Sequence, residues 1–210
     1  MAKLKKIETG FGVIGIWKIT ESAQELELQY NPSEKERSAL ELISAGKRKK
    51  EFLIVRILLK ELLGFTPEIT YEKTGKPKLA NSTLNISISH SNDLVVVFLS
   101  EKCIGIDVEN CERDISRITN RFLHPSEIEF VEKSTNKQHL KIILWSAKEA
   151  IFKCCREQGI QFNREIIVQP FQLKENEYFL GKRIGSVQTS YFKLWFFYVG
   201  NNVVVYCVET

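Results

Sequence analysis

The sequence has 210 residues, of which 43% are hydrophobic and 27% charged, and its formal net charge is +4. This is the composition of an ordinary soluble globular protein, and the small positive charge by itself says little about nucleic acid. The longest apolar run, around Trp195 to Val208, is interrupted at Gly200 and is too short to span a bilayer.

The five cysteines form no C-x-x-C pair, and their number is odd. Thiols in a reducing compartment fit this pattern better than a disulfide framework does. No apolar segment follows the basic start of the chain, so no signal peptide is expected. We therefore expect a cytoplasmic protein.

In the first part of the chain, residues 11–19 are predicted to form a strand. Ser33 and Glu36 have the spacing of a capping box, which predicts a helix that continues to about residue 43. A second helix is expected over residues 47–63, ending at Gly64. Because it is apolar almost all round, this helix should be buried between other elements.

Further along, strands and turns alternate before a second helical region begins. We expect strands at 69–72, 84–89, 94–99 and 104–109, helices over 126–152 with a polar break at 134–137, and strands again to the end. The order of elements predicts an α+β chain of two similar lobes, residues 1–102 and 103–210, with the metal site described below in the second lobe.

Two acidic residues share one face of the predicted strand at 104–109. Side chains alternate along a strand, so Asp107 and Glu109 point away from the apolar side, roughly 6.5–7 Å apart. Two carboxylates this close repel each other unless a cation lies nearby. D-x-E is a weak motif, and when it is taken alone a solvated acidic strand face is slightly the better explanation.

The helix around Trp145 changes that balance. Glu149 and Lys153 are four residues apart on one helix face, among neighbours that are mostly apolar. A surface ion pair is the common explanation for such a pair. However, a partly buried carboxylate needs a counter-charge, and oxygen ligands suit Mg²⁺. Glu149 is thus a third candidate metal ligand, with Lys153 on a phosphate.

Several basic and polar residues are candidates for binding an anion. His90 follows a predicted strand and is flanked by serines, although a histidine in that place is more often structural. Lys47 and Arg48 open the second helix, where cations oppose the helix dipole unless an anion binds there. Arg56 lies in the apolar part of the same helix and needs a partner.

The order of these motifs resembles the 4′-phosphopantetheinyl transferase superfamily, in particular its two-lobed, Sfp-like branch. The resemblance is carried by Gly75-Lys76-Pro77, Ser87-Ile88-Ser89-His90-Ser91, Gly105-Ile106-Asp107-Val108-Glu109 and Trp145-Ser146-Ala147-Lys148-Glu149-Ala150 with Lys153. Each motif alone is weak, but the order and spacing are specific over residues 75–153.

The resemblance implies a fold of two similar lobes in a pseudo-twofold arrangement, each a small, mainly antiparallel sheet packed on a long helix, with coenzyme A between them. It implies Mg²⁺ held by Asp107, Glu109 and Glu149. It also implies coenzyme A phosphates on Ser89, His90 and Lys153, the nucleotide end at Lys76, and the 3′-phosphate at Lys47 or Arg48.

The implied reaction transfers 4′-phosphopantetheine from coenzyme A to a serine of an acyl or peptidyl carrier protein, releasing 3′,5′-ADP. Glu149 would be the general base, with Lys153 and His90 assisting. We expect a monomer with no nucleic-acid or membrane partner. Two alternatives stay open at this point: a Mg²⁺-dependent nuclease that uses D-x-E and a lysine, and a non-catalytic binder of coenzyme A or carrier protein.

Overall fold

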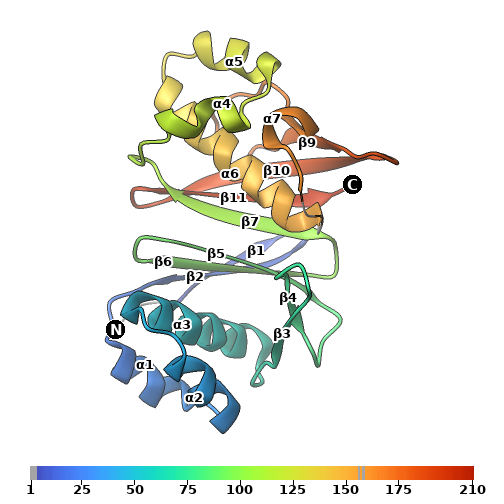
Figure 1. Ribbon diagram of the computed structural model, residues 1–210. Helices are drawn as coiled ribbons and strands as arrows, with labels where there is room; N and C mark the ends of the chain where they lie inside the picture. Colours follow the sequence, from blue (N-terminus) through green and yellow to red (C-terminus); the bar gives the residue numbers. More distant parts are fainter. Residues whose placement is uncertain (1–3, 156, 158) are drawn as a thin grey trace.

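The computed structural model describes residues 4–155, 157 and 159–210, which form four layers. Two antiparallel sheets face each other in the middle, and helices cover the outer face of each sheet (Figure 1). Each half of the chain supplies one sheet and one long helix. The expected α+β fold of two lobes, each with a sheet packed on a long helix, is thus confirmed.

The first half forms a four-stranded sheet of order β1-β2-β6-β5, together with a short β3-β4 hairpin. Its elements are β1 (Lys5–Thr9), β2 (Gly12–Lys18), α1 (Ala23–Tyr30), α2 (Glu34–Glu41), α3 (Gly46–Leu63), β3 (Ile69–Tyr71), β4 (Pro77–Leu79), β5 (Asn85–Ser91) and β6 (Leu94–Ser100).

The second half forms a five-stranded sheet of order β7-β11-β10-β9-β8. Its elements are β7 (Ile104–Asn110), a short 3₁₀ turn (Ser116–Ile118), α4 (Thr119–Phe122), α5 (Pro125–Glu132), α6 (Lys137–Cys155), α7 (Phe162–Glu165), β8 (Ile166–Val168), β9 (Phe179–Ile184), β10 (Thr189–Val199) and β11 (Asn202–Glu209).

Three apolar clusters hold the layers together. One lies between α3 and the first sheet, and another lies between α6 and the second sheet. The third fills the space between the two sheets and includes Ile104, Ile106 and Val108 from one face of β7. The other face of β7, with Asp107 and Glu109, is therefore turned toward α6, as the alternation predicts.

The two sheets also meet along the edges of β5 and β7, where side chains replace the usual backbone ladder. The hydroxyl of Ser87 accepts a hydrogen bond from the backbone N–H of Ile106 at 3.0 Å, and the hydroxyl of Ser89 accepts one from Val108 at 3.3 Å. Both serines are buried. The serine-rich strand β5 thus fixes the position of β7, which carries the acidic residues.

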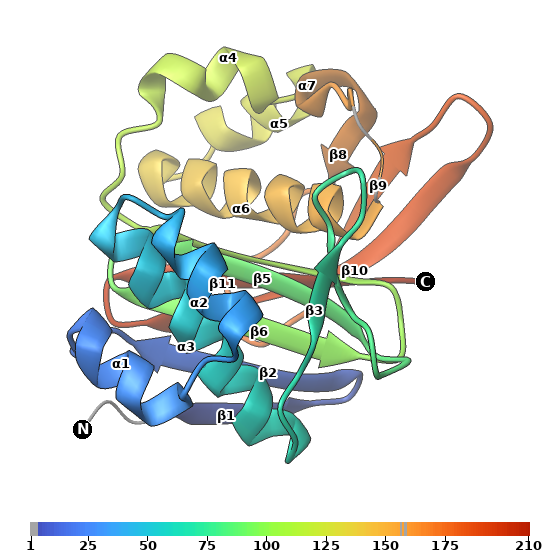
Figure 2. The same ribbon diagram turned by 60° about the horizontal axis from the view of Figure 1, so that its bottom comes forward.

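The absence of a side chain at Gly105 lets α6 come close to β7. A Cβ atom on Gly105 would lie 1.8 Å from the carbonyl oxygen of Ala150, so only glycine fits between the strand and the helix. The last two turns of α6, with Glu149 and Lys153, are thereby held against β7. The β3-β4 hairpin lies beside the end of the same helix (Figure 2), where the ammonium of Lys76 donates to the carbonyl of Cys154 at 3.3 Å.

Most expected elements are present, and the differences are local. The capping box of Ser33 and Glu36 opens α2, and Gly64 ends α3 in the left-handed conformation with φ 76°. His90 lies within β5 and not beyond its end, because β5 continues to Ser91 before the turn to β6. The sequence analysis missed β1, α1, β4 and the short helices α4 and α7.

The chain passes from the first sheet to the second between β6 and β7, next to the predicted lobe boundary at residue 102. Division into two domains at that point stays a prediction. Within the described residues, no helix is both long enough and apolar enough to cross a membrane.

We predict that Gly105→Ala lowers the free energy of unfolding by at least about 2 kcal/mol, since the new methyl group would clash with backbone atoms that cannot rotate away. Urea unfolding followed by circular dichroism measures this loss. Gly46→Ala is the control, because a Cβ there meets no atom within 4 Å, and a change within about 1 kcal/mol is expected. Equal stabilities of the two variants would contradict the close approach.

Candidate active site

Asp107 and Lys153 form the centre of the candidate site. Asp107 lies on β7 and is 5% exposed. The ammonium of Lys153, on α6, lies 2.8 Å from Oδ1 of Asp107 and also donates to the backbone carbonyl of Ile106 at 3.1 Å and to the hydroxyl of Ser89 at 2.9 Å. These contacts use all three N–H groups of Lys153.

Ser89 links the two halves of the chain at this centre. Its hydroxyl donates to Oδ1 of Asp107 at 2.8 Å and accepts from Val108 N–H and Lys153. One donor and two acceptor positions are the full capacity of a hydroxyl group. Ser89 therefore holds Asp107 and Lys153 in position, and its contact with a coenzyme A phosphate stays a prediction.

Glu109 has two partners that the sequence analysis did not identify. Its Oε1 accepts from the indole N–H of Trp145 at 3.1 Å, and Arg113 forms an ion pair with the same oxygen. The guanidinium carbon of Arg113 also lies 5.9 Å from the centroid of the Trp145 ring. Burial and the nearby charge of Asp107 nevertheless raise the pKa of Glu109.

Glu149 lies on α6, one helical turn before Lys153, and is half-buried. Burial raises the pKa of Glu149 to about 7, the charges of Asp107 and Glu109 add to the rise, and Lys153 partly opposes it. The three carboxylates are therefore close enough to repel one another. A carboxyl group with this pKa can exchange a proton near neutral pH.

The residues present fit a divalent cation. Oδ2 of Asp107 is buried and has no hydrogen-bond partner within the described part of the chain. An orphaned carboxylate oxygen among mutually repelling carboxylates is a donor set that Mg²⁺ satisfies. The ligand oxygens of Asp107, Glu109 and Glu149 do not all lie within 4.8 Å of one another, however. Arg113 pairs with Glu109, and Lys153 pairs with Asp107.

His90 projects from β5 toward the start of α3. Its Nε2 lies 2.9 Å from Nη1 of Arg48, and its Nδ1 lies 3.5 Å from Oε1 of the buried Glu51. A guanidinium only donates, so Nε2 accepts and Nδ1 carries the proton that faces Glu51. Burial lowers the pKa of His90. The charge of Glu51 opposes this shift, and the charges of Arg48 and Lys153 add to it. The imidazole is therefore neutral at pH 7.

Lys76 and Lys153 lie on the wall of a hollow of about 240 Å³ between the two halves of the chain. Pro77, Ile88 and Phe152 contribute apolar atoms to its walls, and Ser87 and Glu157 line it as well. A cavity with apolar walls and two cations is typical of a site for an anionic small molecule. The structure thus places Lys76 near Lys153, although the two residues are far apart in the sequence.

Arg48, Arg56 and His90 line a second hollow of about 300 Å³ beside α3. Arg56 is 6% exposed and already has a partner, because its Nε donates to Oε1 of Glu36 at 2.8 Å and its guanidinium lies over the ring of Phe52. Lys47 is more exposed and lies 3.8 Å from Glu51. Of the three predicted α3 cations, Arg48 alone contacts His90 among the described contacts.

Lys148 has a structural role next to the site. Its ammonium is fully buried, lies 2.8 Å from a carboxylate oxygen of Glu127, and donates to the carbonyls of Phe122, Phe162 and Ile166. Glu127 in turn accepts from the backbone N–H groups of His124 and Val168. This buried pair fastens α4, α5, α7 and β8 to α6 and so keeps Glu149 and Lys153 in register.

Residues 103–205 match the model of the 4′-phosphopantetheinyl transferase superfamily. The matched segment contains β7 and α6, the two elements that carry the acidic residues and Lys153. The predicted resemblance to this superfamily is therefore confirmed over residues 103–205.

Among characterised proteins, the chain is 33% identical to the 4′-phosphopantetheinyl transferase AcpT of Salmonella typhimurium over 114 residues, which are 51% of this chain and 59% of that protein. It is 31% identical to the 4′-phosphopantetheinyl transferase gsp of Aneurinibacillus migulanus over 106 residues, which are 48% of this chain and 44% of that protein. The match thus spans little more than half of the first relative.

Among solved structures, the chain resembles Thermotoga maritima holo-[acyl-carrier-protein] synthase with a TM-score of 0.41 and 20% identity. That alignment covers 50% of this chain and 61% of the other.

We predict that Lys148→Met lowers the free energy of unfolding by about 3–5 kcal/mol, since it leaves the charge of Glu127 buried without its counter-charge. Denaturant unfolding measures the loss. Lys141→Met on the same helix is the matched control, because Lys141 is only half-buried, and a change within about 0.5 kcal/mol is expected. A loss below about 1 kcal/mol for Lys148→Met would contradict a structural role.

A second prediction concerns pH. The pKa of Glu149 is raised from 4.5 to about 7 in the folded chain, so the unfolded chain loses this proton first as the pH rises. Folding stability should fall between pH 4.5 and 7 and then level off. We expect Glu149→Gln to remove about 2–3 kcal/mol of that fall. The measurement is the free energy of urea unfolding of the wild type and of Glu149→Gln between pH 4.5 and 7, in the presence of a chelator. The same pH dependence in both proteins would contradict the prediction.

Proposed function

We propose that this chain transfers the 4′-phosphopantetheine group of coenzyme A to a serine of an acyl or peptidyl carrier protein. The observation that carries the proposal is geometric: Glu149 lies one helical turn before Lys153, and Lys153 pairs with the buried Asp107 and lines a hollow together with Lys76. A base, an anion-binding lysine and a place for a phosphate ester thus lie together. The relatives named as 4′-phosphopantetheinyl transferases support the same reading.

Coenzyme A would lie along the hollow between the two halves. Lys76 and Lys153 face its pyrophosphate and nucleotide end, because both line that hollow. The 3′-phosphate would meet Arg48 and His90 at the start of α3, with Lys47 and Arg56 nearby. The first turn of α3 supports this placement, since Ala45 provides no side-chain cap for its N–H groups.

Asp107, Glu109 and Glu149 would hold Mg²⁺, as the unpaired Oδ2 of Asp107 suggests. When bound, the ion neutralises negative charge that builds up on the pyrophosphate.

The chemistry of the chain's own residues follows from their positions. Glu149 accepts the proton of the serine hydroxyl. Its pKa of about 7 belongs to the chain without a metal ion, and a bound Mg²⁺ lowers that pKa. The serine oxygen then bonds to the β-phosphorus as the bond from that phosphorus to the bridging oxygen breaks. The electron pair leaves with 3′,5′-ADP. Lys153 places a positive charge beside the departing phosphate, while Asp107 and Ser89 hold Lys153 in position.

His90 serves as a positioning residue for Arg48 and not as a second base. Burial and Arg48 hold its pKa low, and its Nε2 is bound to the Arg48 guanidinium. We propose that His90 orients Arg48 toward the 3′-phosphate.

We further propose a monomer that works in the cytoplasm. One chain supplies both walls of the hollow, since Lys76 and Ile88 come from the first half and Lys153 from the second. All five cysteines are present as thiols, which fits a reducing compartment. Neither nucleic acid nor a membrane is needed as a partner.

We predict that Glu149→Gln lowers turnover at least about 100-fold, because it removes the proton acceptor. The assay is the mass of several apo carrier proteins after incubation with coenzyme A and Mg²⁺. Glu129→Gln is the matched control, since Glu129 is exposed on α5 and pairs only with Lys133 among the described contacts. It should retain wild-type turnover.

Retained turnover in Glu149→Gln would remove the base assignment. If the wild-type chain adds no phosphopantetheine to any of the carrier proteins, the proposed function itself is wrong.

A further inference from the structure

Four of the five cysteines gather at the other end of β7, away from the carboxylates. Cys103 directly precedes β7, Cys154 and Cys155 end α6, and Cys207 lies in β11. The pKa of Cys154 is lowered by a hydrogen bond with Cys103, but a hydrogen bond with Cys207 and burial outweigh this and raise it. Cys103 and Cys207 are thus both neighbours of Cys154.

Strand register explains why these side chains meet. Cys207 lies opposite Gly105 in the β7–β11 pair, and the N–H of Glu209 donates to the carbonyl of Cys103 at 3.1 Å. Cys103, Cys207 and Glu209 therefore lie on the strand face that Gly105 presents to α6. The same close approach at Gly105 brings the last turn of α6 onto this face, where a Cβ would lie 3.2 Å from the N atom of Cys154.

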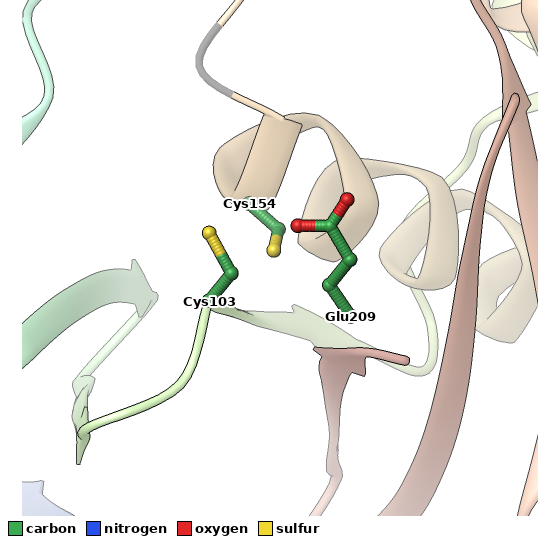
Figure 3. A group of neighbouring side chains, drawn as sticks. All are labelled: Cys103, Cys154 and Glu209. Atoms are coloured by element: carbon green, nitrogen blue, oxygen red, sulfur yellow. The ribbon is translucent and has the colours of Figure 1, made fainter. Parts of the chain in front are cut away.

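The side chains of Cys103, Cys154 and Glu209 point toward one another from three different elements (Figure 3). The two sulfur atoms and one carboxylate oxygen all lie within 4.8 Å of one another. Among the described residues, no other group of three histidine, cysteine or acidic side chains reaches this spacing. The ligand atoms of a tetrahedral zinc site lie about 3.3–3.8 Å apart, so small side-chain rotations would suffice.

We propose that Cys103, Cys154 and Glu209 bind one Zn²⁺ ion, which clamps the end of α6 to β7 and β11. Two thiolates and a carboxylate are ligands that zinc accepts, whereas Mg²⁺ and Ca²⁺ prefer oxygen alone. The fourth ligand is a water molecule, because Cys103 and Glu209 are half-buried and leave the site open at its rim, whereas Cys154 is 1% exposed. Binding releases the two thiol protons to the solvent.

A disulfide between Cys103 and Cys154 would not explain why the carboxylate of Glu209 lies beside the two sulfur atoms. It would use the two sulfur atoms and leave the carboxylate of Glu209 beside them with no role. A bound cation uses all three groups and offsets the charge of the carboxylate.

The clamp would act on the site through the backbone. Cys154 directly follows Lys153, and its carbonyl accepts from Lys76, which lines the hollow between the halves. Zinc at Cys154 would therefore fix the last turn of α6, on which Lys153 depends.

The test is a zinc titration of the full, untagged chain, reduced, stripped with a chelator and competed against a chromophoric zinc indicator. Excess Mg²⁺ is kept in every sample so that the carboxylate site does not take up zinc. We expect one equivalent of Zn²⁺ with a dissociation constant below about 1 μM. Co²⁺ in place of Zn²⁺ should give a thiolate charge-transfer band.

Cys103→Ser and Cys154→Ala should each weaken binding more than about 100-fold, and Glu209→Gln at least about tenfold. Cys111→Ser is the matched control, because Cys111 lies beyond the opposite end of β7 and is also a half-buried thiol. It should bind like the wild type. Cys103 and Glu209 are only half-buried, so their variants keep the test valid if Cys154→Ala fails to fold.

Three results would overturn the proposal: no zinc binding tighter than about 1 μM, equal losses in Cys111→Ser and Cys103→Ser, or a wild-type mass two hydrogens short that shows a Cys103–Cys154 disulfide before reduction. The readout is metal binding, so it stands apart from the transfer activity proposed above.

Discussion

The contact between Lys153 and the buried Asp107 is the interaction on which the rest of the site depends. The carboxylate of Asp107 leaves water at the junction of β5, β7 and α6, and a buried charge is tolerated only when it has a partner and further hydrogen bonds. Ser89 and the carbonyl of Ile106 supply those bonds. The same few atoms therefore hold the two halves of the chain together and place the lysine and carboxylate that the proposed chemistry needs.

Backbone spacing around this contact is set by residues that carry no charge. Gly105 lets α6 approach β7, and Ser87 and Ser89 take the place of a backbone ladder between two sheet edges. Farther along α6, Lys148 and Glu127 neutralise each other inside the second half. The acidic cluster is thus supported on all sides by rigid elements, which suits a site whose groups must keep their distances.

Local patterns in the sequence predicted much of the fold and part of the site. Alternation over residues 104–109 placed Asp107 and Glu109 on one face, and the four-residue spacing of Glu149 and Lys153 placed both on one side of α6. The first helix was missed although Ser22 and Glu25 form a capping box. β1 gave little signal, because it is an edge strand with Ile7 as its one strongly apolar residue.

Contacts between distant segments could not be predicted in this way. Arg113 reaches Glu109 from the loop after β7, and no periodicity marks a loop residue as a partner. Arg56 was expected to need an anion, but Glu36 from α2 supplies the charge. Cys103 and Glu209 meet only because β7 pairs with β11 in one particular register, which depends on packing across the whole second sheet.

The joint between β5 and β7 has a further consequence. Each wall of the hollow comes from a different half, yet both halves belong to one polypeptide, so the facing groups stay at a fixed effective concentration. Dilution cannot separate Lys76 from Lys153, as it would if two subunits met there. The composition of the site is therefore independent of how much of the protein is present.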